Sequence, residues 1–225
     1  MSGFFNVTSL SQLIDLIEDR IFVEKLEINI DEKRLKSDLE MCEKIETCLK
    51  NLPNLKYLKF GNDYNHPTDL SNSQDLEHLE FGVWYNQSTI FPQSGKLKYL
   101  KFGKYYNKPT NLSNLRDLEH LEFGDFYNQL IIFPQSSKLK YLKFGQPYNK
   151  PTDFSNLQDL EHLEFGYYYN KPTDLSQSGK LKYLKFENSY NQSTDFSNLQ
   201  DLEHLKFGMF YNQSTIFPQS GKFKI

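Results

Sequence analysis

Alanine is absent from all 225 residues of the chain, and arginine supplies few of its 26 basic residues. Asparagine, lysine, tyrosine and phenylalanine are abundant instead, which indicates an AT-rich coding genome. No run of about 18 apolar residues occurs, so we expect no membrane-spanning helix. Two cysteines are too few for a disulfide scaffold. The formal net charge of −3 argues against a nucleic-acid partner, because such binding depends on a basic excess.

Sequence signatures of targeting and catalysis are also missing. The first residues, Met-Ser-Gly-Phe-Phe-Asn, lack the basic region and apolar stretch of a secretory signal. No glycine-rich phosphate loop, HExxH, CxxC or nucleophile elbow is present. Nearly all Ser, His, Asp and Glu residues recur at equivalent repeat positions, whereas a catalytic site is a single constellation. We therefore expect a cytoplasmic protein that is not an enzyme and uses no cofactor or metal ion.

A repeat of constant length determines the predicted architecture. The string Leu-x-x-Leu-x-Phe recurs at a constant step of twenty-one positions, beginning at Leu55, Leu76, Leu97, Leu118, Leu139, Leu160, Leu181 and Leu202. Its alternation predicts a short strand with one buried face. The Pro- and Ser-rich segments that follow disfavour a helix, and a repeat this short leaves no room for a long one. One repeat cannot bury its own apolar face, so a stacked parallel solenoid is predicted.

Residues 1–54 do not follow this repeat and predict an N-terminal cap of two helices and a strand. A capping-box pattern at Ser9 precedes apolar residues at helical spacing. A strand pattern runs from Val23 to Ile28. A second helix is expected from Asp31 to Pro53.

Together these patterns predict an α/β repeat protein with a leucine-rich-repeat-like, right-handed solenoid. We expect one parallel sheet, a mostly non-helical convex side and a helical N-terminal cap. The cap covers residues 1–54, and residues 55–225 hold eight repeats and the start of a ninth at Phe223.

Charges alternate from repeat to repeat, because odd strands read Leu-Lys-Tyr-Leu-Lys-Phe and even strands Leu-Glu-His-Leu-Glu-Phe. Parallel strands lie about 4.8 Å apart. One strand position therefore stacks into a charge ladder: Lys59, Glu80, Lys101, Glu122, Lys143, Glu164 and Lys185. We interpret the ladder as fixing the register, because a slip by one repeat would bring like charges together. Lys206 breaks the ladder, and we expect Glu187, which replaces a glycine, to reach Lys185 or Lys206.

Tyrosine and histidine alternate between these charges. The histidines recur on every second strand, about 9–10 Å apart, which is too far for them to share a zinc ion. The two residues before each Tyr-Asn change in every repeat, so the fold does not dictate them. Aromatic residues among them are candidates for a partner-binding rim: Trp84, Tyr105, Phe126, Tyr168 and Phe210. The alternative is that these rings only pack on the neighbouring repeat.

The motif Leu-x-x-Leu-x-Phe-Gly-x-x-Tyr-Asn, followed by Lys-Pro or Gln-Ser, resembles the FNIP repeat. FNIP repeats are leucine-rich-repeat variants of slime moulds and of giant DNA viruses of amoebae, and the resemblance covers residues 55–225. It implies a curved stack used for protein–protein interaction. An asparagine ladder, whose amides bond the backbone of the neighbouring repeat, is expected at Asn65, Asn86, Asn107, Asn128, Asn149, Asn170, Asn191 and Asn212.

The first functional hypothesis is therefore a non-enzymatic protein-interaction module of viral origin that acts in the host cytoplasm. Some FNIP proteins dock on a ubiquitin ligase, so a substrate adaptor is one alternative, and a structural spacer without a specific partner is another. Residues 223–225 only begin a strand, which predicts an open end and a homodimer through the C-terminal ends. A tail folded back over that end is the alternative.

Overall fold

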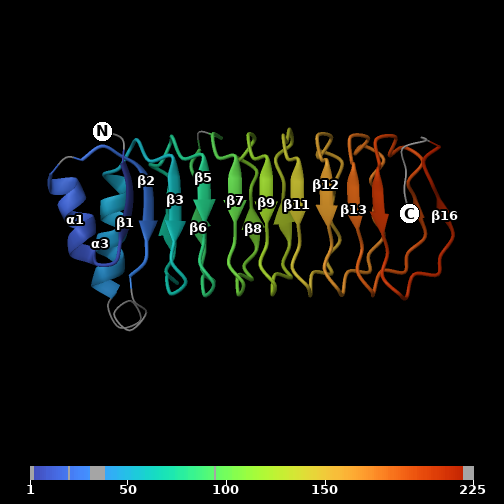
Figure 1. Ribbon diagram of the computed structural model, residues 1–225, viewed down its shortest axis with the longest axis horizontal. Helices are drawn as coiled ribbons and strands as arrows, with labels where there is room; N and C mark the ends of the chain where they lie inside the picture. The colour runs from blue at the N-terminus through green and yellow to red at the C-terminus, as the bar shows by residue number, and fades with distance from the viewer. Residues whose placement is uncertain (1–2, 20, 31–38, 94, 220–225) are drawn as a thin grey trace.

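The chain forms an elongated solenoid, seen from the side in Figure 1, in a computed structural model that describes residues 3–19, 21–30, 39–93 and 95–219. Ten strands form one parallel sheet, called the main sheet below. In sheet order they are β1 (Gly3–Val7), β2 (Val23–Ile28), β3 (Tyr57–Phe60), β5 (His78–Glu80), β7 (Tyr99–Lys101), β9 (His120–Glu122), β11 (Tyr141–Lys143), β12 (His162–Glu164), β13 (Tyr183–Lys185) and β15 (His204–Lys206). The predicted fold class, a leucine-rich-repeat-like solenoid with a helical N-terminal cap, is confirmed.

Two helices lie together at the N-terminal end of the stack: α1 (Leu10–Glu18) and α3 (Leu39–Lys50). Ser9 caps α1 as predicted, since its hydroxyl oxygen accepts a hydrogen bond from the N–H of Gln12 at 3.4 Å. The predicted start of the second helix at Asp31 lies outside the described residues. Buried apolar residues of both helices, among them Leu13 and Ile45, join the same core as the strands.

The strand β1 has no counterpart among the strands predicted from the sequence. It pairs in parallel with β2, and Phe5 lies opposite Leu26. One turn of the solenoid is called a coil below, and this first coil is as long as one of the later repeats. The coil contains the nine-residue helix α1. A short helix thus fits into a coil of this length. The next coil, which contains α3, is longer and runs from Leu26 to its partner Leu58.

All later coils, called the narrow coils below, contain no described helix. They cross the side opposite the main sheet, called the back of the solenoid, in an extended path, as the prolines and serines predict. Short strands pair there in twos, which the sequence did not predict: β4 (Thr68–Asp69) with β6 (Thr89–Ile90), β8 (Thr110–Asn111) with β10 (Ile131–Ile132), and β14 (Thr194–Asp195) with β16 (Thr215–Ile216). An Asp or Asn side chain turns the chain next, because its Oδ1 accepts from the N–H of a serine two residues on, as Asp153 does from Ser155 at 2.9 Å.

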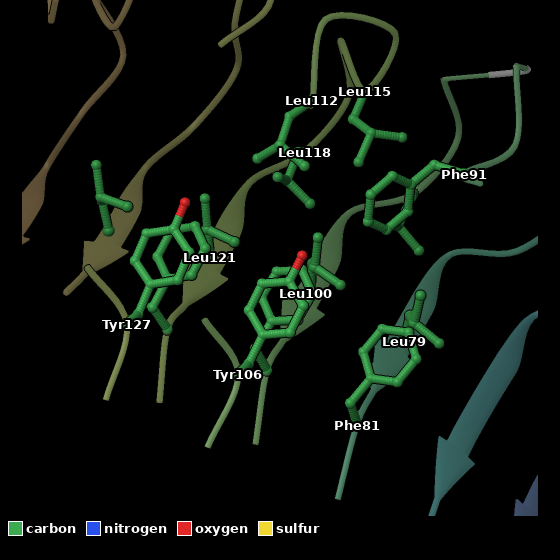
Figure 2. Close-up of a cluster of buried hydrophobic side chains, with 14 of the residues drawn as sticks. Leu79, Phe81, Phe91, Leu100, Tyr106, Leu112, Leu115, Leu118, Leu121 and Tyr127 are labelled. Atoms are coloured by element: carbon green, nitrogen blue, oxygen red, sulfur yellow. The ribbon is translucent and has the colours of Figure 1, made fainter. Parts of the chain in front are cut away.

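Aromatic columns fill the interior beside the strand leucines (Figure 2). Phe81 stacks on Tyr85 of its own coil at 3.9 Å and on Phe102 of the next coil at 5.6 Å between ring centroids. Tyr106 and Tyr127 stack at 5.9 Å in a parallel column. The buried tyrosine hydroxyls bond threonines, as Tyr106 bonds Thr110 at 3.1 Å, so burial leaves them satisfied. The same stacking recurs along the narrow coils and holds neighbouring coils together.

Candidate binding surface

The exposed face of the main sheet carries a continuous stack of rings. It runs through the alternating tyrosines and histidines from Tyr57 to Tyr183, with neighbouring ring centroids 4.1–4.5 Å apart and planes within 18°. Burial against the stack, with Glu122 nearby, raises the pKa of Tyr99 to about 12. The stack stops at His204, whose ring lies 6.2 Å from that of Tyr183 and is tilted by 52°.

The charge ladder lies beside this stack, and the strand register places lysine and glutamate alternately from Lys59 to Lys185. Its glutamates bond the histidine two residues earlier on their own strand, a contact that the sequence analysis did not foresee. His120 Nε2 lies 2.9 Å from Glu122 Oε1, and Lys101 Nζ lies 3.3 Å from Glu122 Oε2. The bond with His120 and the charge of Lys101 outweigh burial and lower the pKa of Glu122 to about 2.

A second row of charges at the start of the strands pairs more regularly. Lys98 lies 2.7 Å from Glu77, and Lys140 lies 2.7 Å from Glu119. In each pair the lysine belongs to the coil that follows the coil of the glutamate. Lys182 repeats the arrangement with Glu161. Because these side chains are largely exposed, each pair stabilises the fold little.

The alternation breaks once, between β13 and β15, where Lys185 lies opposite Lys206. Glu187 Oε1 lies 2.5 Å from Lys185 Nζ, which confirms the expected ion pair. Lys206 Nζ instead lies 5.6 Å from the centre of the Tyr183 ring. The carboxylate at the glycine position thus supplies the negative charge that the ladder lacks there.

The predicted asparagines form a ladder along the turns. The Oδ1 of each accepts a hydrogen bond from the backbone N–H of the asparagine one coil later, at 2.8–3.1 Å, for Asn65, Asn86, Asn107, Asn128, Asn149, Asn170 and Asn191. Asn212 donates to the last of these bonds, and its own Oδ1 accepts from Gln213. The ladder satisfies partly buried backbone groups, so these residues hold the frame of the surface.

A groove, here called the glycine groove, runs across the ends of the strands from β2 to the coil of β11 and has a volume of about 600 Å³. The charge ladder lines one side, and the residue after each glycine lines the other: Asn62, Val83, Lys104, Asp125 and Gln146. Glycine backbone forms the floor. A Cβ added to Gly124 would lie 1.9 Å from the carbonyl oxygen of Gly103, so the close stacking of these two coils leaves no room for a side chain at Gly124. No motif in the sequence indicated this groove, since missing side chains create it.

Three of the predicted rim residues form one aromatic strip beside the groove: Trp84, Tyr105 and Phe126. The rings stack at 4.3 Å and 5.0 Å between centroids, and Trp84 and Phe126 keep 46% and 47% of their surface exposed. Tyr168 and Phe210 are also exposed but lie in other coils, outside the strip. Packing on the neighbouring coil and exposure to solvent therefore coexist in the strip.

The opposite side of the solenoid exposes apolar residues that the sequence analysis did not single out: Ile90, Leu130, Ile132 and Ile216. They belong to the Gln-Ser-Thr-Ile or Gln-Leu-Ile-Ile tails of even repeats. The coil of Ile90 and the coil of Ile132 are separated by the coil of Asn111, so these side chains form no continuous row.

Other kinds of site find little support in the described part of the chain. No group of three or more His, Cys, Asp and Glu side chains there is arranged to hold a metal ion. Cys42 and Cys48 are buried and unbridged, and burial raises the pKa of the Cys48 thiol. None of the described helices has the length and apolar character needed to cross a membrane. Residues 223–225, on which the predicted C-terminal dimer depends, lie outside the described residues.

No protein-family model matches the chain, and no curated protein matches it. Among solved structures, the chain is similar to an internalin from Listeria monocytogenes, with a TM-score of 0.57 and 22% identity. The similarity covers 90% of this chain and 58% of the internalin chain. At this identity the likeness shows the fold alone, which is that of a leucine-rich-repeat solenoid.

Proposed function

We propose that the chain is a non-enzymatic protein-interaction module that binds its partner through the aromatic strip. The observation that carries the proposal is the stacking of Trp84, Tyr105 and Phe126 on consecutive coils with about half of the Trp84 and Phe126 surface left exposed. Trp and Tyr are enriched among residues that dominate binding energy. Rings already ordered by stacking also lose little conformational freedom when a partner binds.

Two further observations favour the strip over the apolar residues on the back. The strip is continuous from coil to coil, whereas Ile90 and Ile132 are interrupted by the coil of Asn111. Its residues also occupy the positions that vary between repeats, so a specific surface there costs the frame nothing. The internalin-like fold and the resemblance to FNIP repeats support the same function, and a viral protein acting in a host cell is part of the proposal.

The test is a capture experiment with three forms of the intact chain in an extract of its native cells. The forms are the parent, a strip variant (Trp84→Ala, Tyr105→Ala, Phe126→Ala) and a back variant (Ile90→Ala, Leu130→Ala, Ile132→Ala). Equal melting of all three forms is checked first by circular dichroism. We expect the parent and the back variant to retain the same protein and the strip variant to bind it at least tenfold more weakly, about 1.4 kcal/mol.

Retention of that protein by the strip variant would contradict the proposal. Capture of a ubiquitin-ligase scaffold by all three forms would favour the adaptor alternative. Absence of any protein common to repeated captures would favour the spacer.

A further inference from the structure

The charges along the glycine groove are grouped by coil. In the coil of β7, Lys101 and Lys104 line the two sides, so the groove is basic there. In the next coil Glu122 and Asp125 line the two sides, and the groove is acidic. Lys143 makes it basic again one coil later. A ligand lying along the groove therefore contacts basic and acidic coils in alternation.

Several of these charged side chains are exposed and available to contact a ligand. Lys101 keeps 44% of its side chain exposed although it contacts Glu122. Lys143 is exposed and makes no ion pair with any described residue. Lys104 and Asp125 are exposed as well. Lys104 Nζ lies 5.8 Å and 5.9 Å from the centres of the Tyr105 and Phe126 rings and has no carboxylate partner among the described residues. The groove thus offers lysines and a carboxylate to a ligand without first breaking its own structure.

The spacing of the charges selects one peptide conformation. Like charges recur on every second coil, about 9.6 Å apart. A polyproline-II helix repeats one face every three residues, or about 9.3 Å. An extended strand repeats a face after about 6.7 Å, and an α-helix turns once in about 5.4 Å. One polyproline-II turn matches the two-coil spacing most closely, because two α-helical turns span about 10.8 Å and drift by about 1.2 Å for every two coils.

We propose that the glycine groove binds a mixed-charge peptide in the polyproline-II conformation, with an acidic residue at every third position and basic residues between. From the coil of β2 to that of β11 the groove covers about 24 Å, which corresponds to about eight residues at 3.1 Å each. The bare glycine floor lets the peptide lie close to the backbone. This inference deepens the proposed function and rests on it, since the groove and the aromatic strip belong to the same coils and bind one partner together.

The probe is a fluorescently labelled peptide of five Pro-Glu-Lys triplets, titrated with the intact chain and followed by anisotropy. A block peptide, in which five glutamates are followed by five prolines and then five lysines, has the same composition and net charge but no triplet period. We expect the triplet peptide to bind at least tenfold more tightly than the block peptide at low salt. Its affinity should fall several-fold between about 50 and 200 mM salt, because the contacts are ionic.

Matched variants test the position of the peptide. Lys104→Glu reverses a charge in the groove, and Lys108→Glu makes the same change in the same coil but outside it. We expect Lys104→Glu to weaken the triplet peptide at least fivefold and Lys108→Glu to leave it within twofold, with equal melting curves. Equal affinity for both peptides, or equal effects of both variants, would overturn the inference.

The peptide titration and the capture experiment can give different outcomes, so the groove inference and the proposed function are tested separately. If the triplet peptide does not bind while the strip variant still loses its captured partner, the groove inference fails and the proposed function stands. If light scattering shows instead that the chain dimerises and that Lys104→Glu abolishes the dimer, the groove binds a second copy, and the peptide proposal is wrong.

Discussion

The coil of α1 and the narrow coils that follow α3 advance the main sheet by the same length of chain, yet they cross the back of the solenoid differently. The first coil contains a nine-residue helix capped by Ser9. The narrow coils run extended and hold their turns with Asx bonds such as Asp153 to Ser155. The number of residues in a coil therefore does not determine whether the segment opposite the main sheet is helical or extended. In the first coil a capping residue favours a helix. In the narrow coils prolines and Asx turns favour an extended path.

The two regions also differ in how coils hold one another. The helical end relies on apolar side chains, such as Leu13 of α1 and Ile45 of α3, both fully buried. The narrow coils add the asparagine ladder, the ring columns and the contact of glycine on glycine. At the glycine position the coil of β2 has Asn29 instead, whose Oδ1 would lie 2.6 Å from a Cβ added to Gly61. The asparagine, ring and glycine contacts recur from coil to coil, so neighbouring narrow coils are joined by the same kinds of contact.

The largest effects are expected from truncating a core leucine in each region. Leu121→Ala in β9 and Leu13→Ala in α1 both empty fully buried positions and should each cost about 2–5 kcal/mol. Leu121 supports two interfaces, so its loss should shift the unfolding of the whole array. Leu13→Ala should lower only the urea midpoint of the far-ultraviolet helical signal, with the near-ultraviolet tyrosine signal melting later. Coincident loss of both signals in Leu13→Ala would show that the two regions unfold as one.

Close stacking can be broken at a single glycine. Gly124→Ala puts a Cβ 1.9 Å from a backbone oxygen, so the coils must move apart, at a cost of about 1–3 kcal/mol. Gly179→Ala is the control, because the nearest atom to its added Cβ is 3.7 Å away. Urea unfolding should separate the two variants clearly. A Gly179→Ala protein as unstable as Gly124→Ala would mean that backbone freedom, and not the stacking contact, makes these glycines necessary.

The asparagine ladder predicts a difference between the middle and the end of the described array. Asn128→Ala leaves the backbone N–H of Asn149 without its acceptor and should cost about 1–2 kcal/mol. Asn212→Ala removes an Oδ1 that accepts only from the side chain of Gln213 within the described residues, so a cost below about 0.5 kcal/mol is expected. Hydrogen exchange at Asn149 should quicken in the first variant. Unchanged exchange there would contradict a supporting role for the ladder.

The smallest expected effect is a change in how the stability of the fold depends on pH below about pH 5. The pKa of Glu122 in the folded chain is about 2 against an ordinary value of 4.5, so its stabilising effect is complete above about pH 5 and is lost as the pH falls from 4.5 towards 2. Glu122→Gln should flatten the fall of the urea midpoint between pH 5 and pH 3. Glu18→Gln in α1 is the control, because the exposed Glu18 carboxylate makes no ion pair with described residues. This variant should not flatten the fall of the urea midpoint. Parallel pH profiles of parent and Glu122→Gln would rule out this role of the His120 contact.

What the sequence predicted well is what the chain repeats. The leucines, the order of charges and the asparagines recur at a fixed step, so one inference about a strand applied to all the narrow coils. The strand β1 occurs once, before a helix, and Gly3–Val7 is too short to stand out alone. The bond of His120 to Glu122 depends on how the ring stack tilts the imidazole. The glycine groove depends on side chains that are absent, and only the stacked coils give it a shape.

The pairing of each acidic coil with the basic coil after it also limits how the gene can change. Duplication or deletion of two whole coils keeps every junction between coils of opposite charge. Gain or loss of a single coil creates a junction of like charges. A like-charge contact also arises by single substitution where Lys206 lies opposite Lys185, although Asp201 and Glu203 keep the rest of that coil acidic, and there Glu187 occupies a position that is glycine in every neighbouring narrow coil. The pair of coils is therefore the unit whose repetition keeps opposite charges adjacent, and the one like-charge contact among the described strands is accompanied by a carboxylate at Glu187.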